Sequence, residues 1–134
     1  MIVVDTNLLA YLLIPGDRTD MAERVLRKDD QWSAPLIWRS ELRNVLVKLV
    51  RGGIVEPDRA FMIMTQAESM MNGCEYDVVS GDVLSLALSS GCSAYDAEFV
   101  VLARDLAAPL VTWDKKILAG FPDMAVSPEG FEAR

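Results

Sequence analysis

Short apolar runs alternate along this chain with longer stretches that have helical periodicity. Residues 2–4, 32–35, 76–79 and 110–113 have the length and composition of buried β-strands, and residues 125–126 fit a short edge strand. Between these runs, apolar residues recur at spacings of three and four, which places them on one face of a helix. Strands that alternate with helices predict crossover connections. We therefore expect a mostly parallel central sheet flanked by helices on both faces, a three-layer α/β sandwich.

Several helix boundaries are marked by residues that start or stop helices. Pro15-Gly16 should end the first helix and Gly52-Gly53 the third, whereas Pro57 is placed as the first residue of a helix. Ser80 and Ser93 are expected as N-caps. The predicted helices run through residues 8–13, 20–28, from 37 to the glycine pair, from 57, through 83–88, through 95–106, and briefly at 117–118.

The length and composition predict one globular domain spanning residues 1–134. Hydrophobic residues make up 51% of the chain and charged residues 25%, which excludes a disordered protein. The 13 Lys and Arg against 20 Asp and Glu give a net charge of −7. This balance opposes unspecific coating of nucleic acid, which needs a basic surface. An enzyme whose acids are neutralised locally by a metal ion remains compatible with it.

The chain has no histidine, which excludes serine–histidine catalysis, histidine acid–base catalysis and nearly every kind of zinc site. Its two cysteines, Cys74 and Cys92, are isolated, and we expect reduced structural thiols in a cytoplasmic protein. No apolar run approaches the roughly 20 residues of a membrane-spanning helix. The N-terminus lacks a basic leader, so we expect neither a signal peptide nor a membrane partner.

Four carboxylates occupy positions that a parallel sheet delivers to one edge. Asp5 and Asp114 each follow a predicted strand, Asp96 lies in the first turn after Ser93, and Glu41 lies early in the third helix. The carboxyl ends of parallel strands and the amino ends of the following helices share one edge, where ligands bind. Acids gathered there repel one another unless a cation is present, and hard oxygen ligands suit Mg²⁺ or Mn²⁺. The sequence therefore predicts a divalent-metal site.

Each acid also has an ordinary structural alternative. Asp5 and Asp114 could simply cap the helices that follow them, and Asp96 could complete a capping box with Ser93. Glu41 could lie in solvent at the flank of its helix. The metal site is favoured because three of the four acids occupy strand-end or helix-start positions along the same predicted edge.

Other polar residues are candidates for supporting roles. Thr6 and Asn7 could orient a carboxylate or a bound water, and Thr112 should face the same side of its strand as Asp114. Arg39 with Arg43, and Lys115 with Lys116, could contact phosphates near the cleft. The alternative for the two arginines is a solvated helix face.

The ordered set of these residues resembles the PIN-domain ribonucleases. The resemblance rests on the strand followed by Asp5-Thr6-Asn7, on Glu41 in the third helix, on the segment Ser93-Ala94-Tyr95-Asp96-Ala97, and on Val111-Thr112-Trp113-Asp114. It covers about residues 2–126 and is nearest to the VapC-like toxins of toxin–antitoxin pairs. All four acids of the family pattern are present. Trp113 stands where the family often has a smaller residue, which could alter substrate contact.

The resemblance implies a PIN-like fold and Mg²⁺-dependent endonucleolytic cleavage of RNA, with Mn²⁺ as a substitute. It further implies a homodimer and inhibition by a cognate antitoxin. Asp5, Asp96 and Asp114 would then bind the metal directly or through water. Glu41 would be a ligand or would orient the attacking water as a base.

Other classes of protein also place an acid after the first strand. Haloacid-dehalogenase-like phosphatases normally have a second Asp two residues later, where this chain has Asn7. Receiver-like signalling domains normally carry an acidic pair at the first strand end, where this chain has Asp5 alone. A third alternative is a metal-binding scaffold without nuclease activity.

Overall fold

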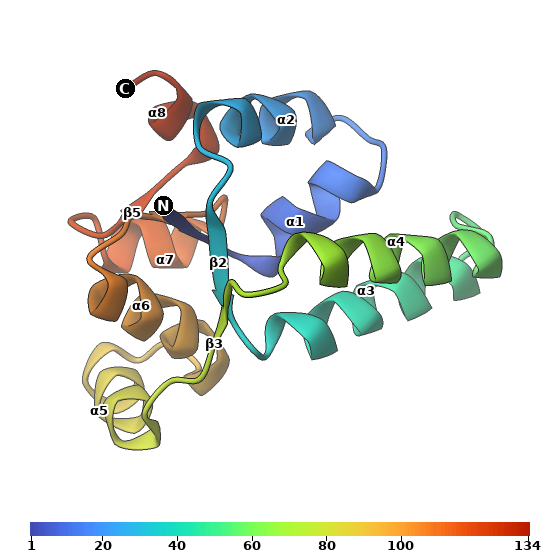
Figure 1. Cartoon of the computed structure of the whole chain (residues 1–134). Helices are drawn as coiled ribbons and strands as arrows, with labels where there is room; N and C mark the ends of the chain where they lie inside the picture. The colour runs from blue at the N-terminus through green and yellow to red at the C-terminus, as the bar shows by residue number, and fades with distance from the viewer.

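The computed structural model describes residues 1–134 and contains one wholly parallel sheet of five strands (Figure 1). The strands are β1 (Ile2–Val4), β2 (Trp32–Pro35), β3 (Glu75–Tyr76), β4 (Leu110–Val111) and β5 (Ala125–Val126), in the order β3-β2-β1-β4-β5. The central strand β1 places Val3 opposite Ser33 of β2 and Leu110 of β4. The predicted parallel sheet is confirmed.

Eight helices cover this sheet. They are α1 (Thr6–Leu13), α2 (Thr19–Lys28), α3 (Trp38–Arg51), α4 (Pro57–Met70), α5 (Ser80–Ser90), α6 (Ala94–Leu106), α7 (Lys115–Gly120) and α8 (Pro128–Glu132). Helix α6 packs on β1, β2 and β4, and α5 packs on α6; helix α1 packs against α2, α3 and α4. Figure 1 shows α1, α3 and α4 on one side of β2 and α5 and α6 on the other, so the expected three-layer sandwich is confirmed. Every helix is too short or too polar to cross a bilayer.

The position of β1 creates a crevice at the carboxyl edge of the sheet. From β1 the chain runs outward to β2 and β3 on one side, and then returns to build β4 and β5 on the other side. The connections that leave β1 and β4 therefore diverge, and ligands bind at such a reversal of strand order. All three residues of β1 are buried in the core, which fixes the residue that follows them, Asp5, at this point.

Some predicted element boundaries were wrong. The predicted strand at 76–79 is β3, which pairs Glu75 and Tyr76 with the last two residues of β2. Because β2 ends at Pro35, the following residues have no strand to continue pairing with. Strand β4 ends two residues earlier than predicted, although the N–H of Thr112 still bonds to the carbonyl of Val126 at 3.0 Å. Ser80 lies inside α5 and does not cap it, since Val79 is the N-cap.

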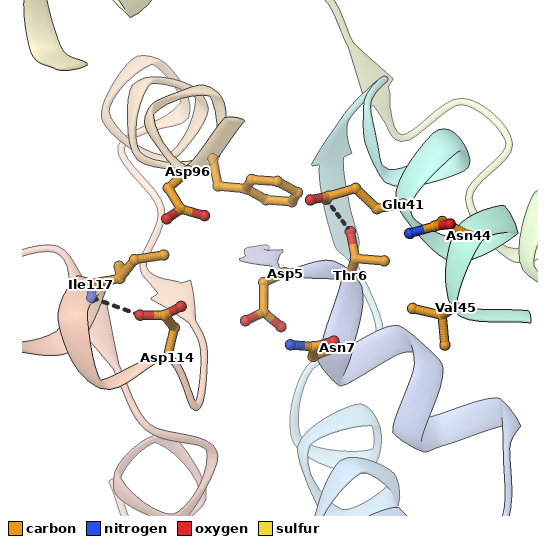
Figure 2. A pocket seen from close by; sticks show the side chains of 10 residues that line it. Asp5, Thr6, Asn7, Glu41, Asn44, Val45, Asp96, Asp114 and Ile117 are labelled. Atoms are coloured by element: carbon orange, nitrogen blue, oxygen red, sulfur yellow. Dashed lines mark hydrogen bonds between the residues drawn. The ribbon is translucent and has the colours of Figure 1, made fainter. Parts of the chain in front are cut away.

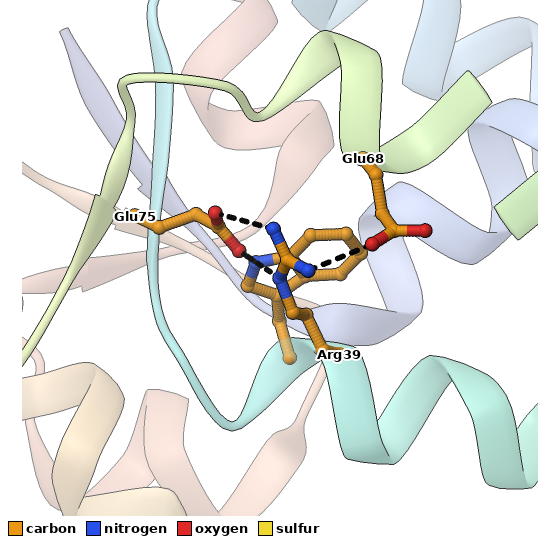
Figure 3. Close-up of polar contacts among 4 residues, drawn as sticks. Arg39, Glu68 and Glu75 are labelled. Atoms are coloured by element: carbon orange, nitrogen blue, oxygen red, sulfur yellow. Dashed lines mark hydrogen bonds and ion pairs between the residues drawn. The ribbon is translucent and has the colours of Figure 1, made fainter. Parts of the chain in front are cut away.

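The guanidinium of Arg39 joins three elements that are distant in sequence. It donates to Glu75 of β3, with Nη2 2.8 Å from Oε2, and to Glu68 of α4, with Nη1 2.7 Å from Oε2 (Figure 3). The indole N–H of the buried Trp38 donates to Glu75 at 2.8 Å. The bond from Arg39 lowers the pKa of the Glu75 carboxyl. The prediction that Arg39 contacts phosphates, with a solvated helix face as the alternative, was therefore wrong on both counts.

We predict that this network stabilises the fold through the junction of α3, α4 and β3. Arg39→Ala leaves Glu75, whose side chain is 14% exposed, without its charged partner, so the melting temperature should fall by roughly 5 °C. Arg24→Ala is the matched control, because Arg24 forms an exposed pair with Asp20 one helical turn away. Thermal unfolding followed by circular dichroism measures both. Equal melting temperatures for the two variants would contradict a stabilising role for the network.

Candidate active site

The four predicted acids line a single cavity of about 210 Å³ beyond the carboxyl ends of β1 and β4 (Figure 2). The cavity also receives the predicted Thr6 and Asn7. Its complete lining is Asp5, Thr6, Asn7, Glu41, Asn44, Val45, Asp96, Phe99, Asp114 and Ile117. Thr112 is fully buried next to the cavity and bonds to two of its acids. The sequence therefore predicted correctly which acids would come together.

Asp5 is a buried carboxylate held from two sides. Its Oδ1 accepts the N–H of Leu8 at 2.9 Å, which caps α1, and its Oδ2 accepts the hydroxyl of Thr112. Burial raises the pKa of Asp5 from 3.8 to about 6, and the carboxylates of Asp114 and Glu41 add to the rise. The two hydrogen bonds act in the opposite direction. The acid is thus fixed in position but is costly to ionise without a nearby cation.

Glu41 extends toward the cavity from the first turn of α3. The hydroxyl of Thr6 donates to its Oε1 at 2.7 Å (Figure 2). Burial raises the pKa of Glu41, and the charge of Asp96 adds to the effect, whereas the bond from Thr6 opposes it. Asp5 is thus one acid of the cavity, and the next residue, Thr6, orients a second one, Glu41. The hydrogen bond from Thr6 to Glu41 is consistent with the prediction that Thr6 orients a carboxylate.

Asp96 and Asp114 approach the cavity from the opposite side, at the starts of α6 and α7 (Figure 2). Oδ1 of Asp114 accepts the N–H groups of Lys116 and Ile117 at 2.9 and 3.0 Å. The backbone N–H of Asp114 donates to the Thr112 hydroxyl oxygen at 2.9 Å. Burial and the charge of Asp114 raise the pKa of Asp96. Both acids are partly exposed, and Oδ2 of Asp114 makes no hydrogen bond.

The donor set suits a hard divalent cation. Four carboxylates line the cavity, no Lys or Arg lines it, and burial with mutual repulsion raises the pKa of three of the acids. In the described side-chain positions, no three carboxylates are grouped closely enough to hold one ion. The types of side chain in the lining thus fit Mg²⁺ or Mn²⁺, whereas their positions do not yet form a complete coordination shell. For three of these carboxylates to bind one ion, they would have to move closer together.

Sequence reasoning missed four residues of the lining. Val45 lies four residues after Glu41 in α3, and Asn44 lies three residues after it; Phe99 and Ile117 lie three residues after Asp96 and Asp114. Residues three and four apart share one face of a helix, so this spacing was a usable signal. Asn44 is the one additional polar member of the lining and carries an exposed amide.

The basic residues predicted to contact phosphates lie in different places: Lys115 and Lys116 near the acidic cavity, and Arg43 away from it. Lys116 lies close enough to the cavity to lower the pKa of Asp96, and Lys115 is exposed beside it at the start of α7. Arg43 instead lines a separate apolar groove between α3 and α4. Positive charge near the acids is therefore found at the start of α7 and not along α3.

We predict that Asp5 makes the metal-free protein less stable as the pH rises. A carboxyl whose pKa is higher in the folded than in the unfolded state favours folding at low pH, and this contribution is lost as the pH rises through about 6. Between about pH 4 and about pH 7 in chelator, the wild type should lose about 2 to 3 kcal/mol of unfolding free energy relative to Asp5→Asn. Urea denaturation at both pH values measures the difference. The same pH dependence in both proteins would contradict the raised pKa.

The chain is similar in sequence to a known ribonuclease and similar in fold to two solved structures. The chain is 29% identical over 124 residues to Ribonuclease VapC3 of Pyrobaculum aerophilum, covering 90% of this chain and 95% of that protein. The crystal structure of PAE2754 from Pyrobaculum aerophilum matches with a TM-score of 0.78 and 22% identity, covering 98% of this chain and 93% of that one.

A second solved structure, a toxin–antitoxin complex from Klebsiella pneumoniae, matches with a TM-score of 0.63 and 23% identity, covering 96% of this chain and 98% of that one. No protein-family model matches the chain. The fold matches extend over nearly the full length of each protein, as the sequence match does. The chain is therefore similar in sequence to a VapC ribonuclease, and it shares its fold with both solved structures.

Proposed function

We propose that this chain is a Mg²⁺- or Mn²⁺-dependent endoribonuclease that hydrolyses phosphodiester bonds of cytoplasmic RNA, and that it is the toxin of a toxin–antitoxin pair. The observation that carries the proposal is the convergence of Asp5, Glu41, Asp96 and Asp114 on one cavity that no basic residue lines. The similarity to Ribonuclease VapC3 supports RNA as the substrate.

Asp5, Asp96 and Asp114 would hold the metal, directly or through water. Asp5 is buried and fixed by its bonds to Leu8 and Thr112, whereas Asp96 and Asp114 are more exposed and can adjust toward an ion. A bound Mg²⁺ or Mn²⁺ would lower the pKa of a water and offset negative charge on the phosphate. The helix-capping bonds of Asp114 engage only its Oδ1, which leaves Oδ2 available as a ligand atom.

Glu41 is suited to orient the attacking water and receive its proton. Its Oε1 is engaged by Thr6, which leaves Oε2 without a hydrogen bond. Its pKa is raised by burial and by the charge of Asp96, so the carboxylate is a better proton acceptor than an exposed Glu would be. Thr6 fixes the direction from which this base approaches the substrate.

The acidic cavity also explains why RNA should depend on the metal to enter. A phosphate that approaches four carboxylates without a cation is repelled, and the net charge of −7 strengthens the repulsion. The substrate is therefore expected to bind weakly in chelator. The same repulsion would make the cavity a receptor for a positively charged side chain of an inhibitor.

We predict cleavage of single-stranded or loop RNA with Mg²⁺ or Mn²⁺ and none with chelator. Asp5→Asn and Asp96→Asn should each lower the cleavage rate at least about 100-fold, because each removes a metal-binding charge. Asp105→Asn is the matched control, since Asp105 is exposed on the same helix as Asp96 and does not line the cavity. Digestion of total cellular RNA followed by mapping of the cleavage ends gives the rates and the sites.

Thermal unfolding measures metal binding independently of RNA cleavage. Mg²⁺ should raise the melting temperature of the wild type and of Asp105→Asn, and should leave Asp5→Asn and Asp96→Asn unchanged. Metal stabilisation that persists in both site variants would place the ion elsewhere. Cleavage that proceeds equally in chelator would reject the metal-dependent mechanism.

The proposed antitoxin has a suitable apolar groove to occupy. Leu12 and Leu13 of α1 line a cavity of about 930 Å³ with residues of α2 and α4. Phe61 and Met62, 76% and 64% exposed, present apolar surface along this groove. We propose that the antitoxin places an apolar segment here and an Arg or Lys in the acidic cavity.

We predict that the product of a small adjoining gene co-purifies with this chain and suppresses its ribonuclease activity. Phe61→Ser should weaken the association about tenfold, because it removes exposed apolar area from the groove. Leu88→Ser on α5 is the matched control, since Leu88 is 85% exposed and outside the groove. Light scattering on the same samples tests the homodimer that the family resemblance implies. If no neighbouring product binds, a stand-alone nuclease remains and the antitoxin proposal fails.

A further inference from the structure

A cation–aromatic stack is formed by three residues outside the acidic cavity, Tyr11, Arg18 and Trp113. The guanidinium of Arg18 lies over two rings, with its Cζ 4.8 Å from the centroid of Trp113 and 5.4 Å from that of Tyr11. The two rings meet edge to face, with centroids 5.5 Å apart and an interplanar angle of 90°. The indole N–H of Trp113 donates to both carboxylate oxygens of Glu129 at 3.0 Å. The platform under Arg18 is thereby held by contacts from α1, the segment after β4, and α8.

The stack is joined to the rim of the cavity at two points. Trp113 directly precedes Asp114, which lines the cavity. Tyr11 lies one helical turn after Asn7 on α1, and Asn7 also lines the cavity. The stack is thereby connected through the backbone to two residues of the cavity lining.

The side chain of Arg18 is held in place by the two aromatic rings, but its N–H donors have no hydrogen-bond partner. Its side chain makes no hydrogen bond and no ion pair in the structure, which describes every residue of the chain. Arg39 differs, because Glu75 and Glu68 take up its donors. Asp20, two residues after Arg18, is already paired with Arg24 at 3.1 Å. The planar donor fork of Arg18 is therefore preorganised and unused, the state that favours binding of a phosphate.

We infer that Arg18, stacked on Trp113 and Tyr11, binds a backbone phosphate of single-stranded RNA next to the cleavage site. The inference rests on the proposed ribonuclease function and adds a substrate-binding residue outside the acidic cavity. It also gives Trp113 a role as the ring that supports the arginine. An anion held here would supply attraction that the cavity itself lacks, since only acidic, amide, hydroxyl and apolar side chains line it.

The test measures affinity for RNA in a form of the protein that leaves the RNA intact. In the Glu41→Gln background with Mg²⁺, which keeps the three proposed metal ligands and removes the proposed base, binding of a labelled single-stranded oligoribonucleotide is followed by fluorescence anisotropy over a range of salt concentrations. Arg18→Ala should raise Kd about tenfold and reduce the slope of log Kd against log salt by about 0.7, the value for one phosphate contact to a single strand. Trp113→Leu should have an effect in the same direction, and Trp113→Phe a smaller one.

Arg24→Ala is the matched control, because it removes one exposed positive charge from α2, the helix that begins directly after Arg18, while Arg24 already pairs with Asp20. Arg18→Gln provides a second variant, which keeps a polar group over the rings and removes the charge. A purely structural stack would lower the melting temperature of Arg18→Ala and Arg18→Gln without changing the salt slope.

A cleavage assay on the wild-type chain distinguishes failure of the proposed ribonuclease function from failure of the proposed phosphate contact of Arg18. If the wild type cleaves RNA and the salt slopes of Arg18→Ala and Arg24→Ala are equal, the phosphate contact is wrong and the nuclease stands. If the wild type neither cleaves nor binds RNA with Mg²⁺ present, the proposed function fails and this inference fails with it. A loss of slope specific to Arg18 in a protein that cleaves RNA supports both.

Discussion

The burial of one carboxylate, Asp5, is the constraint on which the site depends. The central strand β1 is fully buried and delivers this acid to the point where the strand order reverses. Burial raises its pKa to about 6 even though Leu8 and Thr112 donate to it. A side chain at this position that served the fold alone would not need a charge. The cost of ionising Asp5 is an argument for a ligand that stabilises the charged form.

Helix capping and site formation turn out to be two uses of the same acids. Asp5 caps α1 and Asp114 caps α7, as the structural alternatives predicted, yet both line the cavity. A cap engages one carboxylate oxygen and fixes the side chain at the amino end of a helix, where the N–H groups favour negative charge. The cap therefore orients the carboxylate without preventing its other oxygen from facing a ligand. The two interpretations were not exclusive, because the hydrogen bonds show the caps while the same acids line the cavity.

The sequence predicted the features that depend on local patterns and missed those that depend on tertiary contacts. The alternation of strands and helices, the cap at Ser93 and the placement of the acids after strands or early in helices follow from local patterns, and the general geometry of a parallel sheet brings such positions to one edge. The end of β3 at Tyr76 depends on where β2 ends, and the ion pairs of Arg39 depend on the packing of α3, α4 and β3. Neither dependence is visible in the residues nearby. The position of Arg18 over Trp113 likewise joins segments far apart in the chain.

The two arginines show how an acidic protein can still keep one positive side chain free to bind an anion. Arg39 is surrounded by Glu68, Glu75 and the ring of Trp38, so its charge is used within the fold. Arg18 rests on aromatic rings, whose faces attract its charge without engaging its N–H donors in hydrogen bonds. An aromatic support thus keeps a cation in place and leaves its donors available. In a chain with a net charge of −7, such local placement has more influence on where a phosphate binds than the overall balance of charge.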